Sequence, residues 1–181
     1  MRLGIYVGSF NPPHEGHHKV MKYLLEKNLV EKVLLLPTPN YWDKNDLLNI
    51  EDRIKMLKLY EEENIEVDEK HNKYPYTYEV LRSIKKDYPE DDLYLVIGSD
   101  NLERFHEWKN IEEILENKVI VLKRDKIIKN PYLEKYKNQF LYQEDFEPII
   151  VSSTDIRNGE KKYLHPAIKK YMEDHNLYEN I

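Results

Sequence analysis

The chain contains no cysteine among its 181 residues, which excludes both a disulfide framework and a thiolate metal site. Nothing at its start resembles a basic region followed by an apolar run and a cleavage site. No apolar stretch approaches the roughly 20 residues that a membrane-spanning helix needs. We therefore expect a cytoplasmic protein that does not enter a membrane.

An excess of positive charge is also lacking, since 28 Lys and Arg stand against 34 Asp and Glu, for a formal net charge of −6. Binding of duplex nucleic acid depends on a dense basic surface, so nucleic acid is not an expected partner. A small phosphorylated ligand is compatible with this charge, because it needs only a few aimed donors within an acidic protein.

Apolar residues make up 40% of the chain and fall in ordered clusters, so we expect it to fold, as a single domain over residues 1–181. The first unit is a buried strand over 2–7 that ends at Gly8, then a helix over 14–28 and a second strand over 32–36. The later expected elements are helices at 50–63, 77–87 and 111–116, strands at 65–68, 93–98, 118–122 and 148–151, and closing helices at 153–159 and 166–175.

Strands that alternate with helices in this way predict an α/β fold, a doubly wound, Rossmann-like parallel sheet with helices on both faces. Ligands in such sheets bind beyond the carboxyl ends of the strands. The polar and aromatic stretch 123–143 has no clear period, and we assign it no function.

The segment from Gly8 to His17 reads GSFNPPHEGH and leads from the first strand into the first helix. A glycine at a strand end lets the backbone approach a ligand, and the amides of a helix start form an anion site. His14 and His17 are three residues apart, so they share one helix face and could both contact one phosphate. An ordinary helix start with surface histidines is the alternative, but two histidines with a glycine between them, at the loop where a parallel sheet offers phosphate binding, favour a functional role. A zinc pair would need a third ligand, for which we see no motif.

A second anion site is predicted near the C-terminus, in the segment VSSTDIR from Val151 to Arg157. Ser152, Ser153 and Thr154 can cap a helix and present hydroxyls and amides, and Arg157 can return its guanidinium to the same anion one turn later. An ordinary helix cap with an exposed arginine is the alternative in isolation. Because the first motif also predicts an anion site, the ordinary helix cap is the weaker interpretation.

Together these segments resemble a known family. GSFNPPHEGH resembles the signature of the H-x-G-H nucleotidyltransferases, and more narrowly that of the nicotinate or nicotinamide mononucleotide adenylyltransferases. VSSTDIR resembles the family motif I-S-S-T-x-I-R. Gly98 to Asp100 with the later Trp108 resembles its G-[AS]-D segment, and PYTYEVL at 75–81 is similar to its Y-T-x-x-x-L segment.

The resemblance covers most of the chain and implies an enzyme that transfers AMP from ATP to a pyridine mononucleotide, releasing pyrophosphate and forming a dinucleotide of the NAD type. The implied catalytic residues are His14, His17 and Arg157. The implied ATP-binding residues are Gly8, Ser9, Phe10, Gly98, Asp100, Ser152, Ser153 and Thr154, and the implied substrate-binding residues are Lys44, Tyr76, Thr77 and Trp108.

An aspartate after a strand is otherwise a common turn former, and a tryptophan is more often a packing residue, so the resemblance decides the roles of Asp100 and Trp108. Mg²⁺ is expected because ATP carries it, held largely by phosphate oxygens and water, and no protein metal ligand is predicted.

Three alternatives stay open. Phosphopantetheine adenylyltransferases usually have threonine where this chain has His14, and cytidylyltransferases differ in the late arginine motif. A nucleotide-sensing module without catalysis would be expected to lose His14, His17 or Arg157.

The loop PTPNYWDKNDL lacks the two adjacent prolines before a basic residue that many nicotinate mononucleotide enzymes have. Nicotinate mononucleotide is therefore favoured over nicotinamide mononucleotide only weakly. The oligomeric state is also open, a homo-oligomer included.

Overall fold

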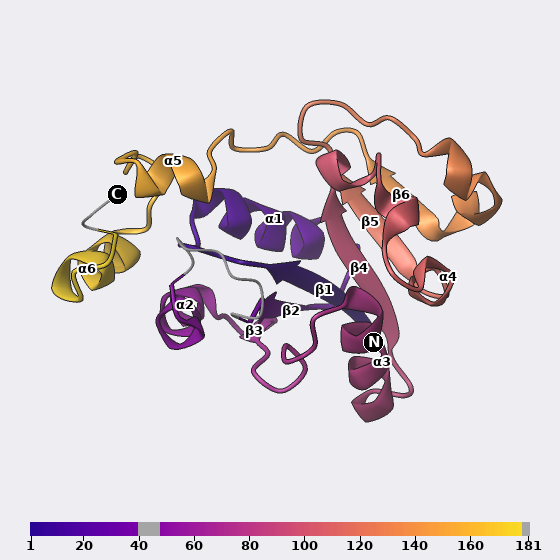
Figure 1. Ribbon diagram of the computed structural model, residues 1–181, viewed down its shortest axis with the longest axis horizontal. Helices are drawn as coiled ribbons and strands as arrows, with labels where there is room; N and C mark the ends of the chain where they lie inside the picture. Colours follow the sequence, from indigo (N-terminus) through magenta and orange to yellow (C-terminus); the bar gives the residue numbers. More distant parts are fainter. Residues whose placement is uncertain (40–47, 179–181) are drawn as a thin grey trace.

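A computed structural model of the chain describes residues 1–39 and 48–178 (Figure 1). Within this part, six parallel strands form one sheet in the order β3-β2-β1-β4-β5-β6. The chain thus winds in one direction from β1 and in the other from β4, and the switch point lies between these two strands. The strands are β1 Arg2–Gly8, β2 Lys32–Pro37, β3 Ile65–Val67, β4 Asp92–Gly98, β5 Lys118–Leu122 and β6 Phe140–Gln143.

Helices cover both faces of this sheet, as predicted. The helices are α1 Glu15–Glu26, α2 Ile50–Leu57, α3 Thr77–Asp87, α4 Ile111–Ile114, α5 Ser153–Arg157 and α6 Pro166–Asp174. One apolar cluster joins α1, α2, α5 and α6 to one face, and a second joins α3 and α4 to the other. Because side chains alternate along a strand, Val33 and Leu35 of β2 enter the first cluster while Leu34 and Leu36 enter the second.

The strand predicted at 148–151 is wrong. The sixth strand is β6, which lies in the stretch that carried no predicted element and follows a series of 3₁₀ turns over Pro131–Gln139. Pro148 has no N–H to donate to a ladder, whereas β6 is an edge strand paired on one side only, with β5. The four residues of β6 are too few to show the alternation of apolar and polar side chains that marks a strand. The chain instead passes from β6 to α5 across α1 (Figure 1).

The second helix is also shorter than predicted. It ends at Leu57 and continues as a 3₁₀ turn over Lys58–Tyr60, because the chain must reverse at once to bring Ile65 into β3. An antiparallel bridge between Glu62 and Ile65 closes this reversal. The other predicted elements begin and end within about two residues of the observed ones.

Arg53 on α2 fastens this end of the sheet, and its side chain is completely buried. Its Nε donates to the carbonyl oxygen of Leu48 at 2.9 Å, its Nη1 to that of Ser9 at 2.8 Å and its Nη2 to that of Thr38 at 2.6 Å. Burial lowers the pKa of Arg53 to about 10. This value is still well above 7, so the guanidinium is charged at neutral pH. One side chain therefore ties together the loop after β1, the end of β2 and the start of α2.

We expect Arg53→Met to lower the free energy of unfolding by about 3 kcal/mol or more, because three carbonyl oxygens lose a donor at a cost of about 1–3 kcal/mol each where buried. Arg82→Met on α3 is the matched control, since Arg82 is 62% exposed and pairs with Glu113 at the surface. Such a pair contributes about 1 kcal/mol or less. Urea unfolding curves measure both changes, and equal losses would show that Arg53 does not hold the three segments.

Candidate nucleotide-binding site

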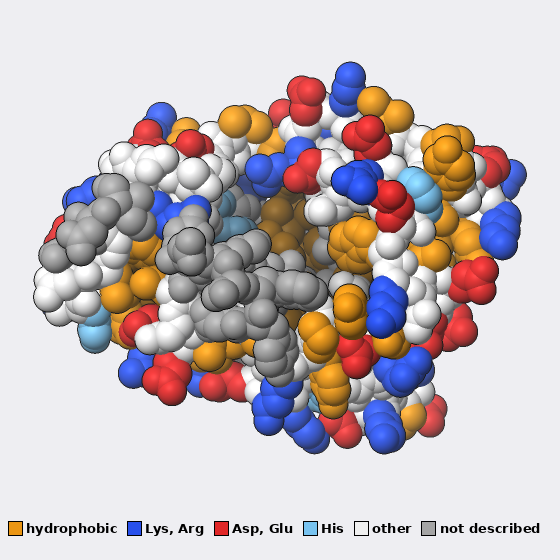
Figure 2. Space-filling view, viewed as in Figure 1, with side chains coloured by type: hydrophobic (Ala, Val, Ile, Leu, Met, Phe, Trp, Pro, Cys, Tyr) orange, Lys and Arg blue, Asp and Glu red, His pale blue; other side chains and the backbone are white. Residues whose placement is uncertain are grey.

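A hollow opens beyond the carboxyl ends of β1 and β4, at the switch point of the sheet. It encloses about 440 Å³, which is within the range of small-molecule sites. A second hollow adjoins it and shares Ser9, His17 and Arg124 with it. Figure 2 shows the molecule hollowed in the middle of this face, with apolar side chains at the bottom and a histidine beside them.

His14 and His17 are locked to the start of α1 by their own backbone. His14 is the N-cap residue, and its Nδ1 accepts from the amide of Gly16 at 3.0 Å. The Nδ1 of His17 accepts from the amide of His14 at 3.0 Å. Because both Nδ1 atoms are acceptors, each neutral ring carries its proton on Nε2. The two rings stack with their centroids 3.7 Å apart, and both line one hollow. The site therefore holds a pair of oriented N–H donors.

Gly16 explains the spacing of the two histidines. A Cβ at this position would lie 2.7 Å from Cε1 and 2.9 Å from Nδ1 of His14, closer than side chains approach one another. A larger residue would push the His14 ring away from the helix start and break its bond to the amide. The glycine is therefore required by the imidazole that folds back over it.

Both imidazoles are neutral at physiological pH. Burial, with the nearby positive charge of Arg124, lowers the pKa of His14 to about 4. Burial also lowers the pKa of His17 well below its usual range, and the charges of His14 and Arg124 act in the same direction. The two rings are thus hydrogen-bond donors rather than cations in the free protein.

The second predicted motif forms the start of α5. Ser152 is its N-cap residue, and a reciprocal capping box links Ser152 and Asp155, with both bonds at 3.0 Å. This box fixes the helix start, which places the Ser153 and Thr154 side chains on the same hollow as the histidines.

The two motifs meet although more than 140 residues separate them. Ser153 Oγ donates to the carbonyl oxygen of Pro12 at 2.9 Å, and Arg157 Nη1 donates to that of Asn11 at 2.7 Å. Arg157 Nη2 also donates to Thr154 Oγ1 at 3.0 Å. Helix α5 is therefore docked on the loop that precedes His14, and the structure brings both predicted anion sites to one place.

Gly98 and Asp100 lie at the end of β4 and line the first hollow together with the loop after β1. A Cβ on Gly98 would overlap the Asp100 carboxylate, so a larger residue here would displace that side chain. Ser99 Oγ accepts from the amide of Arg124 at 2.9 Å.

Sequence reasoning missed Arg124, which lines both hollows and lies two residues beyond β5. A cation just past the carboxyl end of a strand was the available signal. Its value depends on knowing that β5 pairs with β4.

The remaining predicted residues are distributed around the first hollow. It is lined by Gly8, Ser9, Thr77 and Trp108. The half-buried Trp108 ring packs edge-to-face with the Phe105 ring, with the two ring centroids 4.8 Å apart. Phe10 also lines it but is 1% exposed, so its side chain belongs mainly to the core. Tyr76 lines a smaller neighbouring hollow, which shares Thr77 with the first. Lys44 lies outside the described residues.

Within the described residues, no group of three or more His, Asp or Glu side chains could hold a metal ion. In the same part of the chain, no helix has the length and apolar character to cross a membrane.

Comparison with known proteins identifies the family. Residues 5–159 match the cytidylyltransferase-like family. Proteins from Borrelia hermsii and Acholeplasma laidlawii, each named a probable nicotinate-nucleotide adenylyltransferase, are 34% and 32% identical over 98% of this chain, and over 98% and 97% of their own length. The chain belongs to the nicotinate-nucleotide adenylyltransferase family.

A solved structure agrees with this nicotinate-nucleotide adenylyltransferase fold. The Plasmodium falciparum nicotinic acid mononucleotide adenylyltransferase, complexed with NaAD, superposes with a TM-score of 0.81 at 23% identity, covering 98% of this chain and 97% of the other. The superposition confirms the predicted doubly wound fold over nearly the full length.

We expect an NMR titration of the histidine rings to give His14 a pKa near 4, with its resonance assigned from a His14→Gln variant. An unfolded histidine titrates near 6.5. Between these values the unfolded chain binds a proton that the folded chain does not, so this contribution to stability is complete above about pH 6.5 and is lost as the pH falls towards 4. A His14 pKa above 6 would contradict the buried, neutral pair.

Proposed function

We propose that this protein transfers AMP from ATP to nicotinate mononucleotide, forming deamido-NAD and pyrophosphate in NAD biosynthesis. The observation that carries the proposal is the docking of α5 on the loop after β1, because it places two anion-binding motifs around one hollow. The curated relatives support the choice of reaction, since they are named for it.

The reaction needs no covalent intermediate on the protein. A phosphate oxygen of the mononucleotide attacks the α-phosphorus of ATP, the bond from that phosphorus to the oxygen bridging to the β-phosphate breaks, and pyrophosphate leaves with the bonding electrons. Catalysis then depends on alignment of the reactants and on stabilisation of the developing charge.

Each motif has a part in this alignment. The Nε2–H groups of His14 and His17 donate to the ATP phosphates, whose negative charge increases towards the transition state. Arg157, with Ser153 and Thr154, holds the β- and γ-phosphates and steadies the leaving pyrophosphate. Because neutral donors suffice at the histidines, the cationic charge is supplied by the arginines.

The other expected contacts complete the proposed site. The backbone of Gly8–Phe10 and Ser152 approaches the triphosphate, and Gly98 with Asp100 binds the nucleoside. Mg²⁺ bound to ATP would neutralise phosphate charge and would be held largely by phosphate oxygens and water.

The acceptor lies on the side of β1 and β4 that faces α3 in this proposal. Trp108 offers a flat surface to the pyridine ring, and Tyr76 and Thr77 at the start of α3 lie near its substituent. Lys44 would meet the acceptor phosphate. We place the reaction in the cytoplasm.

A pyrophosphate-release assay with ATP and Mg²⁺ tests the substrate. We expect nicotinate mononucleotide to give the highest kcat/KM, nicotinamide mononucleotide a lower one and phosphopantetheine none. Activity with phosphopantetheine alone would overturn the proposed function. Activity only with the amide would overturn the choice of acceptor while retaining the reaction.

His17→Ala should lower kcat about 10²- to 10³-fold, the usual effect of removing one preorganised donor. His18→Ala is the matched control, because His18 is the next residue of the same helix but faces Glu15, Glu62 and the ring of Tyr60. Steady-state kinetics with matching circular dichroism spectra separate chemistry from folding. Undiminished activity of His17→Ala would remove this residue from the mechanism.

A further inference from the structure

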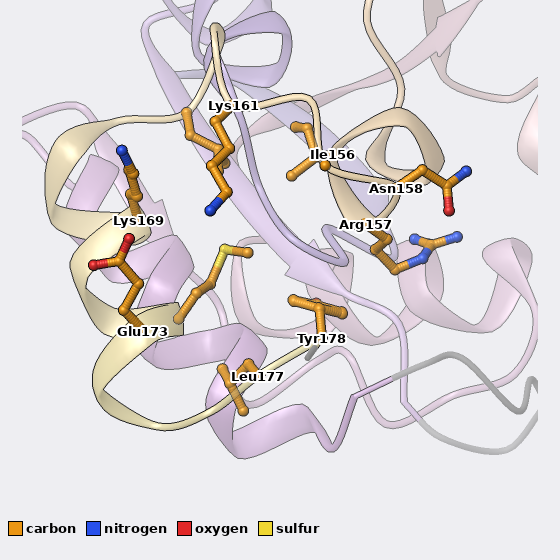
Figure 3. Close-up of a pocket in the computed structure, with 11 residues that line it drawn as sticks. Ile156, Arg157, Asn158, Lys161, Lys169, Glu173, Leu177 and Tyr178 are labelled. Atoms are coloured by element: carbon orange, nitrogen blue, oxygen red, sulfur yellow. The ribbon is translucent and has the colours of Figure 1, made fainter. Parts of the chain in front are cut away.

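The C-terminal turn reaches back to the loop that carries the first phosphate motif. Tyr178 follows α6, and its hydroxyl donates to Oδ1 of Asn11 at 2.5 Å, across 167 residues of sequence. Figure 3 shows Tyr178 next to Leu177, on the side of a hollow that faces Arg157. The tyrosine hydroxyl therefore contacts the loop that leads to His14.

The backbone of this turn is shaped to present the tyrosine. The amide of Leu177 bonds back to the carbonyl oxygen of Met172 at 2.9 Å, which closes the turn after α6. Asn176 and Tyr178 then adopt left-handed conformations, with φ of 53° and 64°. This region is unfavourable for a bulky side chain, and such a residue persists only where its contacts over-determine it.

Asn11 is the point where the contacts of Tyr178 and of the site meet. Its side chain is 3% exposed, and its Oδ1 also accepts from the amide of Leu48 at 3.3 Å. Its backbone carbonyl oxygen accepts the 2.7 Å bond from Arg157 Nη1. A shift of Asn11 would therefore move the acceptor that orients Arg157, and with it the loop leading to His14.

We propose that Tyr178 is a positioning residue for nucleotide binding and transfer, acting through Asn11 on Arg157. The hydroxyl holds the Asn11 side chain, and the fixed Asn11 carbonyl directs the guanidinium towards the triphosphate. The inference rests on the proposed function in that a triphosphate is taken as the ligand, but it does not depend on which mononucleotide is the acceptor.

Tyr178→Phe tests this proposal, since it removes the hydroxyl and keeps the ring. Tyr171→Phe is the matched control, because Tyr171 lies on α6 and its hydroxyl bonds Asp52 at 2.7 Å, away from both hollows at the carboxyl ends of the strands. We expect Tyr178→Phe to weaken binding of Mg²⁺–α,β-methylene-ATP and to lower kcat/KM for ATP, each about three- to tenfold, the value of one hydrogen bond. Tyr171→Phe should change neither by more than about twofold.

Calorimetric binding of the ATP analogue is independent of turnover, so it separates this inference from the proposed function. A wild type that turns over no mononucleotide while Tyr178→Phe still weakens analogue binding would sink the function and support the role of Tyr178. Equal effects of Tyr178→Phe and Tyr171→Phe on binding, at similar melting temperatures, would overturn the role of Tyr178.

A double-mutant cycle with Asn11→Ala tests the route of the effect. If Tyr178 acts through Asn11, adding Tyr178→Phe to Asn11→Ala should change analogue binding less than twofold. Effects that multiply in full would show that the hydroxyl acts elsewhere and would overturn the proposal. Should Asn11→Ala fail to fold, the comparison of the two tyrosine variants decides alone.

Discussion

The site depends on one contact, the docking of α5 on the loop between β1 and α1. Two side chains of α5, Ser153 and Arg157, donate to two consecutive carbonyl oxygens, those of Pro12 and Asn11. Backbone acceptors have fixed directions, so the contact sets the position of the helix as well as holding it. Without it, the serine, threonine and arginine side chains would belong to an ordinary surface helix, and the histidines would face one side of an incomplete hollow.

The charge distribution around the hollow follows from where each group is buried. His14 and His17 are held by short backbone bonds at the start of α1, where burial and Arg124 make a charged imidazole costly. They serve as donors of fixed direction and need no reorganisation when charge develops on a ligand. Arg124 and Arg157 line the same hollow and supply the positive charge. The hollow thus combines neutral donors at the helix start with cations around them.

From the sequence we expected the two motifs to lie together, and they line one hollow, whereas we missed the last strand of the sheet. Long apolar runs such as those of β1, β2 and β4 are plain in the sequence, whereas β6 is a four-residue edge strand in which only Phe140 is buried. The first motif follows β1 directly, as the rule for ligand sites in parallel sheets requires. The second motif does not follow a strand directly, and the resemblance to the family linked it with the first.

The residues that sequence reasoning missed share a property: their partners are distant in sequence and are backbone atoms or side chains of unremarkable type. Arg53 looks like one more charged residue of a surface helix, yet it is fully buried on three carbonyl oxygens. Arg124 can be recognised as a residue of the site only when the pairing of β5 with β4 is known. The bond from Tyr178 to Asn11 spans almost the whole chain, and no local pattern encodes it.

This arrangement has a thermodynamic consequence for how the site is assembled. Closing a loop of some 140 residues costs conformational entropy, but the cost grows only with the logarithm of loop length and is met once. After the first contact between the chain ends forms, each further one is nearly local. The bonds from Ser153, Arg157 and Tyr178 to three atoms of Asn11 and Pro12 therefore share a single closure cost. Three modest hydrogen bonds can in this way hold together a site that no one of them could maintain alone.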